Sequence, residues 1–358
     1  KVGSDILLLQ REDREEQRRE DRRFQLSAAF SKRSRSDHFL AAWTVDRFRF
    51  NFATSSNISR TVTREDTSGT YNGSFTWDLT PKDRHTLPLF KWMGFMPQWI
   101  TGIELRYLPS QLSLDARINR TKQTGVNRQF GQTRTERFRR DLNRALRGKL
   151  RPFRSVSVDY SLNLRNDMRA DSLVSFSKFK FGPEIDYTQT FGIDVRPEVA
   201  TWIRPGYSFN TNYRENRNPE QQIVGTSPDD RTINFNNRRS VRSNLNIDRM
   251  LTSAFGRPGR SRSSQDGEES GRGVGSYVYG GVRGFFSLLN PINMTLSFDN
   301  QQGLFGLRSR PTASYRFGFS DQPGVTAPSA DSTGIIAIQQ DRRTKSSSFT
   351  LDTGMKLI

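Results

Sequence analysis

The chain of 358 residues contains no cysteine and only two histidines. The absence of cysteine excludes disulfides, thiolate metal sites, iron–sulfur clusters and cysteine nucleophiles. His38 and His85 both stand in polar, turn-like surroundings, where surface positions are expected. Two imidazoles without a thiol make a poor metal site. We therefore expect no metal, no cofactor and no enzymatic activity.

Long apolar runs are also missing. Only 33% of the residues are hydrophobic, the mean hydropathy is −0.74 and the formal net charge is +19. No stretch approaches the roughly 20 apolar residues of a spanning helix, which excludes a helical membrane protein. These averages resemble those of disordered chains, yet 26 Phe, 9 Tyr and 5 Trp give an aromatic content of 11%. An ordinary soluble globule is not expected either.

The strongest pattern in the sequence is alternation of apolar and polar residues with period two. Leu112, Leu114, Ala116 and Ile118 alternate with polar residues, and so do the residues from Val156 to Leu164. Such alternation places the apolar side chains on one face of a strand. About a dozen runs of this kind occur between turn-like segments. Others are Phe48/Phe50/Phe52, Phe75/Trp77/Leu79, Ile103/Leu105/Tyr107, Phe191/Ile193/Val195, Tyr207/Phe209, Leu245/Ile247, Ile292 to Phe298, Tyr315/Phe317/Phe319 and Phe349/Leu351.

Both a soluble β-sandwich and a transmembrane barrel would show this alternation. The character of the two faces favours the barrel, because one is aromatic and almost uncharged and the other carries Arg, Asp and Asn. We predict an all-β, antiparallel transmembrane β-barrel region of about a dozen strands. The predicted lumen-facing residues are Arg49, Asn51, Arg106, Asp115, Arg117, Asn119, Asp159, Asn163 and Arg165. The predicted lipid-facing residues are Phe48, Phe50, Leu105, Leu112, Leu114, Val156, Val158, Leu162, Met294 and Leu296.

Three segments interrupt the alternation. Residues 1–23 end in an almost wholly charged run and are expected to lie outside the bilayer or to link strands, whereas residues 24–358 form the barrel region. Gly/Ser-rich and Pro-rich stretches at 256–275 and 321–332 predict mobile loops on one barrel rim. A fourth segment, Phe138 to Arg151, suits either a basic amphipathic helix or a strand. We favour the strand because other strands flank it closely.

The net charge of +19 raises the question of nucleic-acid binding. A nucleic-acid module would concentrate its basic residues among aromatics, but Arg is spread along almost every run. We expect no nucleic-acid partner. In a barrel, these charges would meet anionic lipid head groups at the rims and line the lumen. The carboxylates Asp229 and Asp230 follow Pro228 and suit a turn better than a cation site.

Several stretches resemble one protein family. They are Phe24–Phe52, Tyr71–Leu79, Phe95–Arg120 with Leu108–Ser110 at a turn and Asn119–Arg120 at a strand exit, Trp202–Phe255 with Asn236–Arg239, and Pro291–Phe319 with Gly303 and Gly306 in a connection. In this order they are similar to the C-terminal barrel of the SprA family, outer-membrane translocons of the type IX secretion and gliding-motility system. The sequence departs from the family at Asn234–Phe235 and at Ser253–Phe255.

The resemblance implies a protein-conducting channel in the outer membrane of a Gram-negative bacterium. Its partners would be membrane lipids, secreted protein substrates, and plug or gating proteins. The family's barrel has about 36 strands, which implies that this chain is a fragment whose missing strands precede Lys1. Two alternatives remain open, namely another outer-membrane barrel (a porin, receptor or lipopolysaccharide-transport protein) and a basic soluble β protein that binds polyanions.

Overall fold

A computed structural model describes most of the chain. The described residues are 19–32, 43–61, 63–81, 86–88, 104–127, 133–169, 174–175, 180–217, 231–255, 291–307, 309–325 and 341–354. Both histidines, Asp229 and Asp230, residues 1–18 and the predicted loop at 256–275 lie outside them. Of the predicted loop at 321–332, only residues 321–325 are described.

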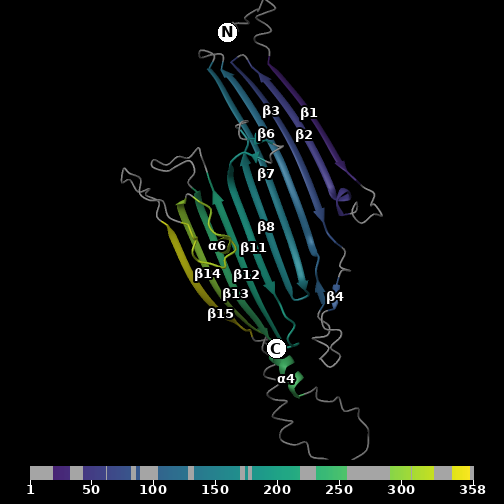
Figure 1. The fold of residues 1–358 in the computed structure, drawn as a ribbon, viewed down its shortest axis with the longest axis vertical. Coiled ribbons are helices and arrows are strands. Elements are labelled where there is room, and N and C mark those ends of the chain that lie inside the picture. The colour runs from purple at the N-terminus through teal and green to yellow at the C-terminus, as the bar shows by residue number, and fades with distance from the viewer. Residues whose placement is uncertain are drawn as a thin grey trace, which may run out of the picture.

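Eleven strands form one large sheet (Figure 1). They are β1 (Glu20–Ser31), β2 (Phe48–Arg60), β3 (Arg64–Leu79), β6 (Pro109–Asn127), β7 (Thr133–Phe153), β8 (Val156–Asp167), β11 (Glu184–Val195), β12 (Ile203–Asn216), β13 (Arg231–Leu245), β14 (Ile292–Leu307) and β15 (Arg342–Asp352). Each strand pairs antiparallel with the next one in this order. The sheet is therefore an antiparallel meander.

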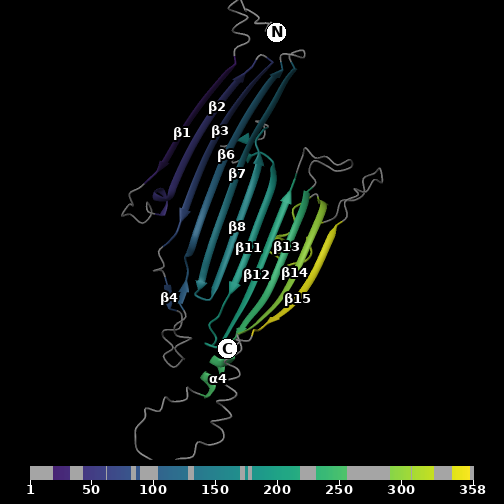
Figure 2. The same cartoon turned by 180° about the vertical axis from the view of Figure 1, so that it is seen from behind.

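The remaining elements are short. β4 (Thr86–Pro88) pairs with β5 (Glu104–Arg106), and β9 (Val174–Ser175) pairs with β10 (Lys180–Phe181), each pair forming a separate two-stranded sheet. The helical elements are η1 (Val45–Arg47), α4 (Ile247–Phe255) and α6 (Ala313–Arg316). Both views show the meander stepping downward along the long axis of the molecule from β1 to β15 (Figures 1 and 2).

Period-two alternation predicted most of these strands correctly. Residues Phe138 to Arg151 lie within the continuous strand β7, which confirms the strand over the helix. The register shows why this basic segment reads ambiguously. Leu142 and Leu146 share one face of the sheet with Arg144 and Gly148, so the segment satisfies period two while its leucines recur every fourth residue. β1 begins at Glu20, so the last four residues of the predicted charged segment belong to a strand.

Two short alternating runs were wrongly predicted as strands. Leu245 ends β13, and Ile247 begins helix α4. Tyr315, Phe317 and Phe319 lie in and just after α6, where Gly318 adopts a positive φ of 77° and ends the helical turn. Three aromatic residues at alternate positions also fit a turn that leaves the helix, so the pattern alone could not separate the two structures.

The strand connections correct two further predictions. Gly303 and Gly306 lie inside β14 and not in a connection. The predicted loops at 256–275 and 321–332 belong to the successive connections β13–β14 and β14–β15. Successive connections of an antiparallel meander leave from opposite ends of its strands. The two loops therefore leave from opposite ends of the sheet, contrary to the prediction of a single rim.

The sheet is open in the part of the chain that the structure describes. Edge strand β1 pairs only with β2, and edge strand β15 pairs only with β14. The predicted all-β antiparallel fold is confirmed, and the described residues form one large open sheet and no closed barrel. Because eleven strands alternate in direction, β1 and β15 run the same way, and direct pairing between them would be parallel.

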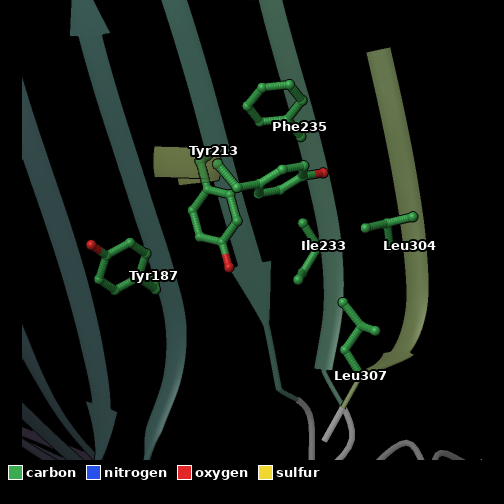
Figure 3. Close-up of a cluster of buried hydrophobic side chains, with 7 residues drawn as sticks. Tyr187, Tyr213, Ile233, Phe235, Leu304 and Leu307 are labelled. Atoms are coloured by element: carbon green, nitrogen blue, oxygen red, sulfur yellow. The ribbon is translucent and has the colours of Figure 1, made fainter. Parts of the chain in front are cut away.

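Buried side chains are concentrated in one half of the sheet. A cluster contains Tyr187, Tyr213, Ile233, Phe235, Leu304 and Leu307 on β11 to β14, together with Tyr315 of α6 (Figure 3). The covering residues come from 309–325, a segment that follows β14 and lies across this face. We call this segment the strap. In Figure 1 the strap, which contains α6, lies in front of β11 to β13.

Candidate functional site

The polar face of the sheet is continuous across neighbouring strands. Asn51, Ser74, Arg117, Asn143 and Arg165 are successive partners in the register from β2 to β8. Directly paired residues in a sheet point to the same side. One row of side chains therefore presents amide, hydroxyl and guanidinium groups on a single surface, which we call the polar face.

The opposite surface, which we call the apolar face, is equally continuous. Phe48, Trp77, Leu114, Leu146 and Leu162 form one row across the same strands. Phe48, Phe50 and Phe75 also pack together as rings, with centroids 5.1 to 6.3 Å apart. Alternation in each strand is thus kept in phase by the register over the whole sheet.

The structure separates the two predicted sets of residues. Eight predicted lumen-facing residues lie on the polar face: Arg49, Asn51, Asp115, Arg117, Asn119, Asp159, Asn163 and Arg165. Nine predicted lipid-facing residues lie on the apolar face: Phe48, Phe50, Leu112, Leu114, Val156, Val158, Leu162, Met294 and Leu296. Leu105 and Arg106 lie on β5, outside the large sheet, so this grouping does not include them.

Charges of both signs lie on the polar face. Lys149 Nζ lies 3.1 Å from Asp159 Oδ1, and Arg214 Nη2 lies 3.3 Å from Asp186 Oδ2. The Thr76 hydroxyl donates to Asp115 Oδ1 at 2.9 Å. Carboxylates therefore interrupt the basic residues, and the face is a mixed polar surface and not a uniform cationic one.

Several hollows lie along this polar face, and two of them have volumes of about 560 and 520 Å³. The first contains Gly192, whose register partners are Asp159 on β8 and Asn210 on β12. A side chain at Gly192 would come within 3.0 Å of Asn210 Oδ1. The hollow therefore depends on a missing side chain between two polar ones, and amides, hydroxyls and basic groups line it.

The apolar face exposes large side chains at both edges of the sheet. On β1 these are Phe24, Leu26 and Phe30, which are 52 to 66% exposed, and on β15 they are Phe349 and Leu351, at 65 and 54%. An exposed apolar surface of this kind marks contact with a protein or a membrane. We call the band of apolar side chains that crosses this face the belt; it is exposed on β1 and mostly half-buried on β14. Its members are Phe24, Leu26, Ala28 and Phe30 on β1, and Ile292, Met294, Leu296 and Phe298 on β14.

The belt does not follow one row of paired residues. The row of Leu26 crosses β7 at Arg140. The row of Leu296 crosses β7 at Phe153. These crossing points are 13 positions apart, and one position is taken up by the irregularity between Leu150 and Phe153. Relative to the rows of paired residues, the belt is therefore displaced along the strands by about 12 residues between β1 and β14.

This displacement fixes the direction of the belt relative to the strands. About 12 residues at about 3.4 Å each correspond to about 41 Å along the strands. The nine steps from β1 to β14, at about 4.8 Å each, correspond to about 43 Å across them. If the belt is horizontal, the strands are tilted by about 44° from its normal. Transmembrane barrels have strand tilts of about 35–45°.

On the strands beneath the strap, buried polar residues interrupt the apolar face. Gln189, Thr211, Glu215, Asn237 and Gln302 are all less than 5% exposed. The strap supplies partners for several of them. Asn237 Nδ2 donates to the carbonyl of Gly318 at 2.7 Å, and Tyr315 Oη donates to Gln302 Oε1 at 3.1 Å.

Aromatic rings fasten the strap to the sheet. Tyr315 is fully buried and stacks on Phe235 with a centroid distance of 4.5 Å. Phe317 meets Phe191 edge-on at 5.2 Å, and Phe319 stacks on Phe209 at 5.7 Å. Figure 3 shows Tyr213, Phe235 and Leu304 pointing into the same covered space. Burial raises the pKa of Tyr315, so its hydroxyl stays protonated and can donate.

An ionic cluster closes the other end of the strap. Arg310 donates to Glu184 at 2.6 Å and to Glu215 at 2.9 Å, and it also lies over the ring of Tyr187 at 4.3 Å. Arg231 pairs with the same Glu215. The two glutamates raise the pKa of Arg310 against the opposing effect of burial. Burying a polar stretch on this face is possible because its charges are paired.

Sequence reasoning missed the strap and its ionic cluster. The partners of Arg310 lie 95 and 126 residues away along the chain, so no local pattern links them. One signal was present: Gln189, Thr211 and Asn237 interrupt the apolar alternation of β11, β12 and β13. Only the register shows that these breaks are adjacent.

Among the described residues, no helix is long and apolar enough to cross a membrane. The same residues include no group of three or more metal-ligating side chains. A scan against protein-family models finds no match to the chain, and a search of curated protein sequences finds none either.

Proposed function

We propose that this chain forms part of the wall of a large outer-membrane β-barrel that conducts proteins, as in the SprA family that its sequence resembles. The diagonal belt is the observation that supports this proposal most. In a bilayer the apolar band of a barrel is level while its strands are tilted by about 35–45°, so the band must cross the rows of paired residues at the same angle. The belt crosses these rows at about 44°. A sheet buried in a soluble sandwich would face a second sheet about 10 Å away, but the described residues form a single large sheet.

The polar face would line the lumen. Its amide, hydroxyl and paired charged groups keep water at the wall, so a passing polypeptide can remain hydrated. The mixed signs of Lys149 with Asp159 and of Arg214 with Asp186 leave no uniform field to hold a charged segment of either sign. The mechanism is conduction through a wide polar channel, with no catalysis and no cofactor, and plug or gating proteins would close the pore.

The open edges of the sheet set a condition on closure. Backbone groups in lipid need partners within protein, so β1 and β15 must each pair with a further strand. Because β1 and β15 run in the same direction, all-antiparallel closure needs an odd number of additional strands. The SprA-like proposal meets this condition with strands from elsewhere in a much larger barrel.

Paired substitutions on adjacent residues test the membrane assignment. Leu114→Arg places a charge on the belt side, and Asp115→Arg places the same charge on the polar face one residue away. We expect Leu114→Arg to block assembly into the outer membrane, at a cost of about 2–4 kcal/mol for a lipid-facing Arg, and Asp115→Arg to assemble. Val158→Arg and Asp159→Arg form a second pair. Equal tolerance at both members of each pair, measured by membrane fractionation, would contradict a lipid-facing belt.

A second experiment separates a protein-conducting channel from another outer-membrane barrel. The Leu114→Arg variant would be introduced into the native bacterium, with Asp115→Arg as the matched control. A translocon predicts that the first strain retains its secreted proteins in the periplasm while the control secretes them. Normal secretion together with impaired uptake of small solutes would favour a porin or receptor. Recovery of the protein in the soluble fraction, with salt-sensitive nucleic-acid binding, would favour the polyanion-binding alternative.

A further inference from the structure

The strap lies at the border of the belt. On β12, Tyr207 lies on the row of Leu296, and Phe209 follows it on the same face, where Phe319 of the strap stacks on it. Glu215, at the other end of the strap, is six residues beyond Phe209, about 20 Å along the strand. One end of the strap thus reaches the apolar belt and the other lies outside it. In a membrane this position corresponds to the level of the lipid head groups.

The residues at that level have an excess of positive charge. Four guanidinium groups, those of Arg144, Arg231, Arg310 and Arg316, surround only two carboxylates, those of Glu184 and Glu215. Arg316 donates to the hydroxyl of Tyr187 at 2.7 Å, which does not neutralise its charge. Among the described residues, this cluster therefore has two more positive charges than negative charges.

Unused hydrogen-bond donors accompany this excess of positive charge. The Nε atoms of Arg144, Arg231 and Arg316 are buried and have no hydrogen-bond partner in the described structure. The side chains of Arg144 and Arg231 remain 31 and 22% exposed, so the cluster is open to an approaching ligand. Guanidinium groups in this setting match the oxygens of a phosphate group, which arginine binds with paired N–H donors.

Aromatic side chains flank the basic cluster on the side of the belt. Phe317 and Phe319 contact Phe191, and Phe319 is 63% exposed. Aromatic residues are typical of the membrane interface. The order along the strap, basic residues outside the belt and aromatic residues at its border, follows the order of phosphate and acyl chain in a lipid.

From this arrangement, which rests on the function proposed above, we propose that the strap and the strand ends beneath it bind the phosphate of an anionic membrane lipid. The guanidinium groups of Arg316, Arg144 and Arg231 would contact the phosphate, and Phe319 would contact the acyl chains. Arg310 holds the strap in place through its two glutamates and is a positioning residue.

Lipid retention by the purified protein tests the site. Native mass spectrometry would compare phosphatidylglycerol with phosphatidylcholine for the wild type, Arg316→Gln and Arg316→Lys. We expect selective retention of phosphatidylglycerol, a loss of about fivefold in Arg316→Gln, the factor for one basic residue near an anionic surface, and a smaller loss in Arg316→Lys. Arg238→Gln, on the polar face, is the matched control and should retain the lipid. Equal retention by the wild type and Arg316→Gln would overturn the proposal.

Two further measurements remove the remaining ambiguities. If protease cleaves the strap in Arg316→Gln, so that the strap has detached, Arg144→Gln tests the same cluster from β7 without changing the strap. Inorganic phosphate added in excess separates a lipid from a free anion: displacement of the lipid by phosphate alone would contradict a lipid site. Membrane fractionation of the same variants distinguishes the two proposals, since a protein that is in the membrane without lipid selectivity defeats only this inference.

Discussion

The apolar face has two regions that differ in their surroundings. From β1 to β8 it is largely uncovered, with Phe30 66% and Leu114 41% exposed, whereas on β11 to β14 the strap covers it and Tyr213 is fully buried. Both regions share the same rows, since Leu114 and Tyr213 lie on one row of paired residues. The comparison shows that alternation decides on which face of the sheet a side chain lies. Its burial depends on its position along the strand and on whether the strap covers it.

Removal of one aromatic ring in each region should lower the free energy of unfolding by unequal amounts. Phe235→Ala removes a ring that is 2% exposed and stacked on Tyr315, so we expect a loss of about 3–5 kcal/mol in the free energy of unfolding. Phe50→Ala removes a ring that is 47% exposed and should cost about 1–2 kcal/mol. Urea unfolding from lipid vesicles would measure both. Equal losses would mean that the strap does not enclose a core.

A substitution at the tightest contact of the strap should detach it. Gly318 has a φ of 77°, and a Cβ atom there would come within 2.3 Å of Thr211 Oγ1 and 2.5 Å of Asn237 Nδ2. Gly318→Val should therefore cost about 1–2 kcal/mol for the left-handed backbone alone, with the steric contact in addition. Limited proteolysis of the strap is the readout. Gly69→Val on β3, where no atom lies within 4 Å of the added Cβ, is the control and should leave cleavage unchanged.

The smallest expected effect is a pH dependence at Asp321, in the C-terminal part of the strap. Lys345 donates to Asp321 at 2.7 Å and holds the pKa of that carboxyl below its usual range. A lowered pKa in the folded state means that the contact stabilises the strap above about pH 4 and is lost as the pH falls through the lowered pKa. A spin label at Ser320→Cys should gain mobility only in acid. Asp321→Asn should be mobile at neutral pH and insensitive to acid; the same acid transition in this variant would assign the effect to another group.

Much of the fold was predictable from the sequence because alternation is a local property. The runs at Leu112–Ile118 and Val156–Leu164 lie in β6 and β8 as predicted, and eight and nine residues of the two predicted sets fall on opposite faces. Prediction failed where a turn imitates a strand, as at Tyr315 to Phe319. Prediction also failed for the two long connections, β13–β14 and β14–β15. The end of the sheet from which each connection leaves depends on how many strands lie between them.

The belt and the strap could not be predicted, for a different physical reason. The displacement from Leu26 to Leu296 is the sum of many small register offsets, each set by a pair of strands and none visible in one strand. The ionic cluster joins Glu184, Glu215 and Arg310 from three strands or segments. Long-range pairing of this kind has no local sequence pattern, because hydrogen-bond partners are chosen only once the sheet has formed.

The depth of three single-cysteine spin labels in lipid tests the central claim most directly. The chain contains no cysteine of its own, so each introduced cysteine is the one label within these residues. Leu26→Cys and Leu296→Cys lie on rows about 12 residues apart yet at the same level of the belt, and we predict equal depths inside the bilayer by collision with oxygen and a polar nickel complex. Arg140→Cys lies on the same row as Leu26 and should report water or head groups. Equal depth for Leu26 and Arg140, or exposure of all three to water, would contradict the tilted barrel wall.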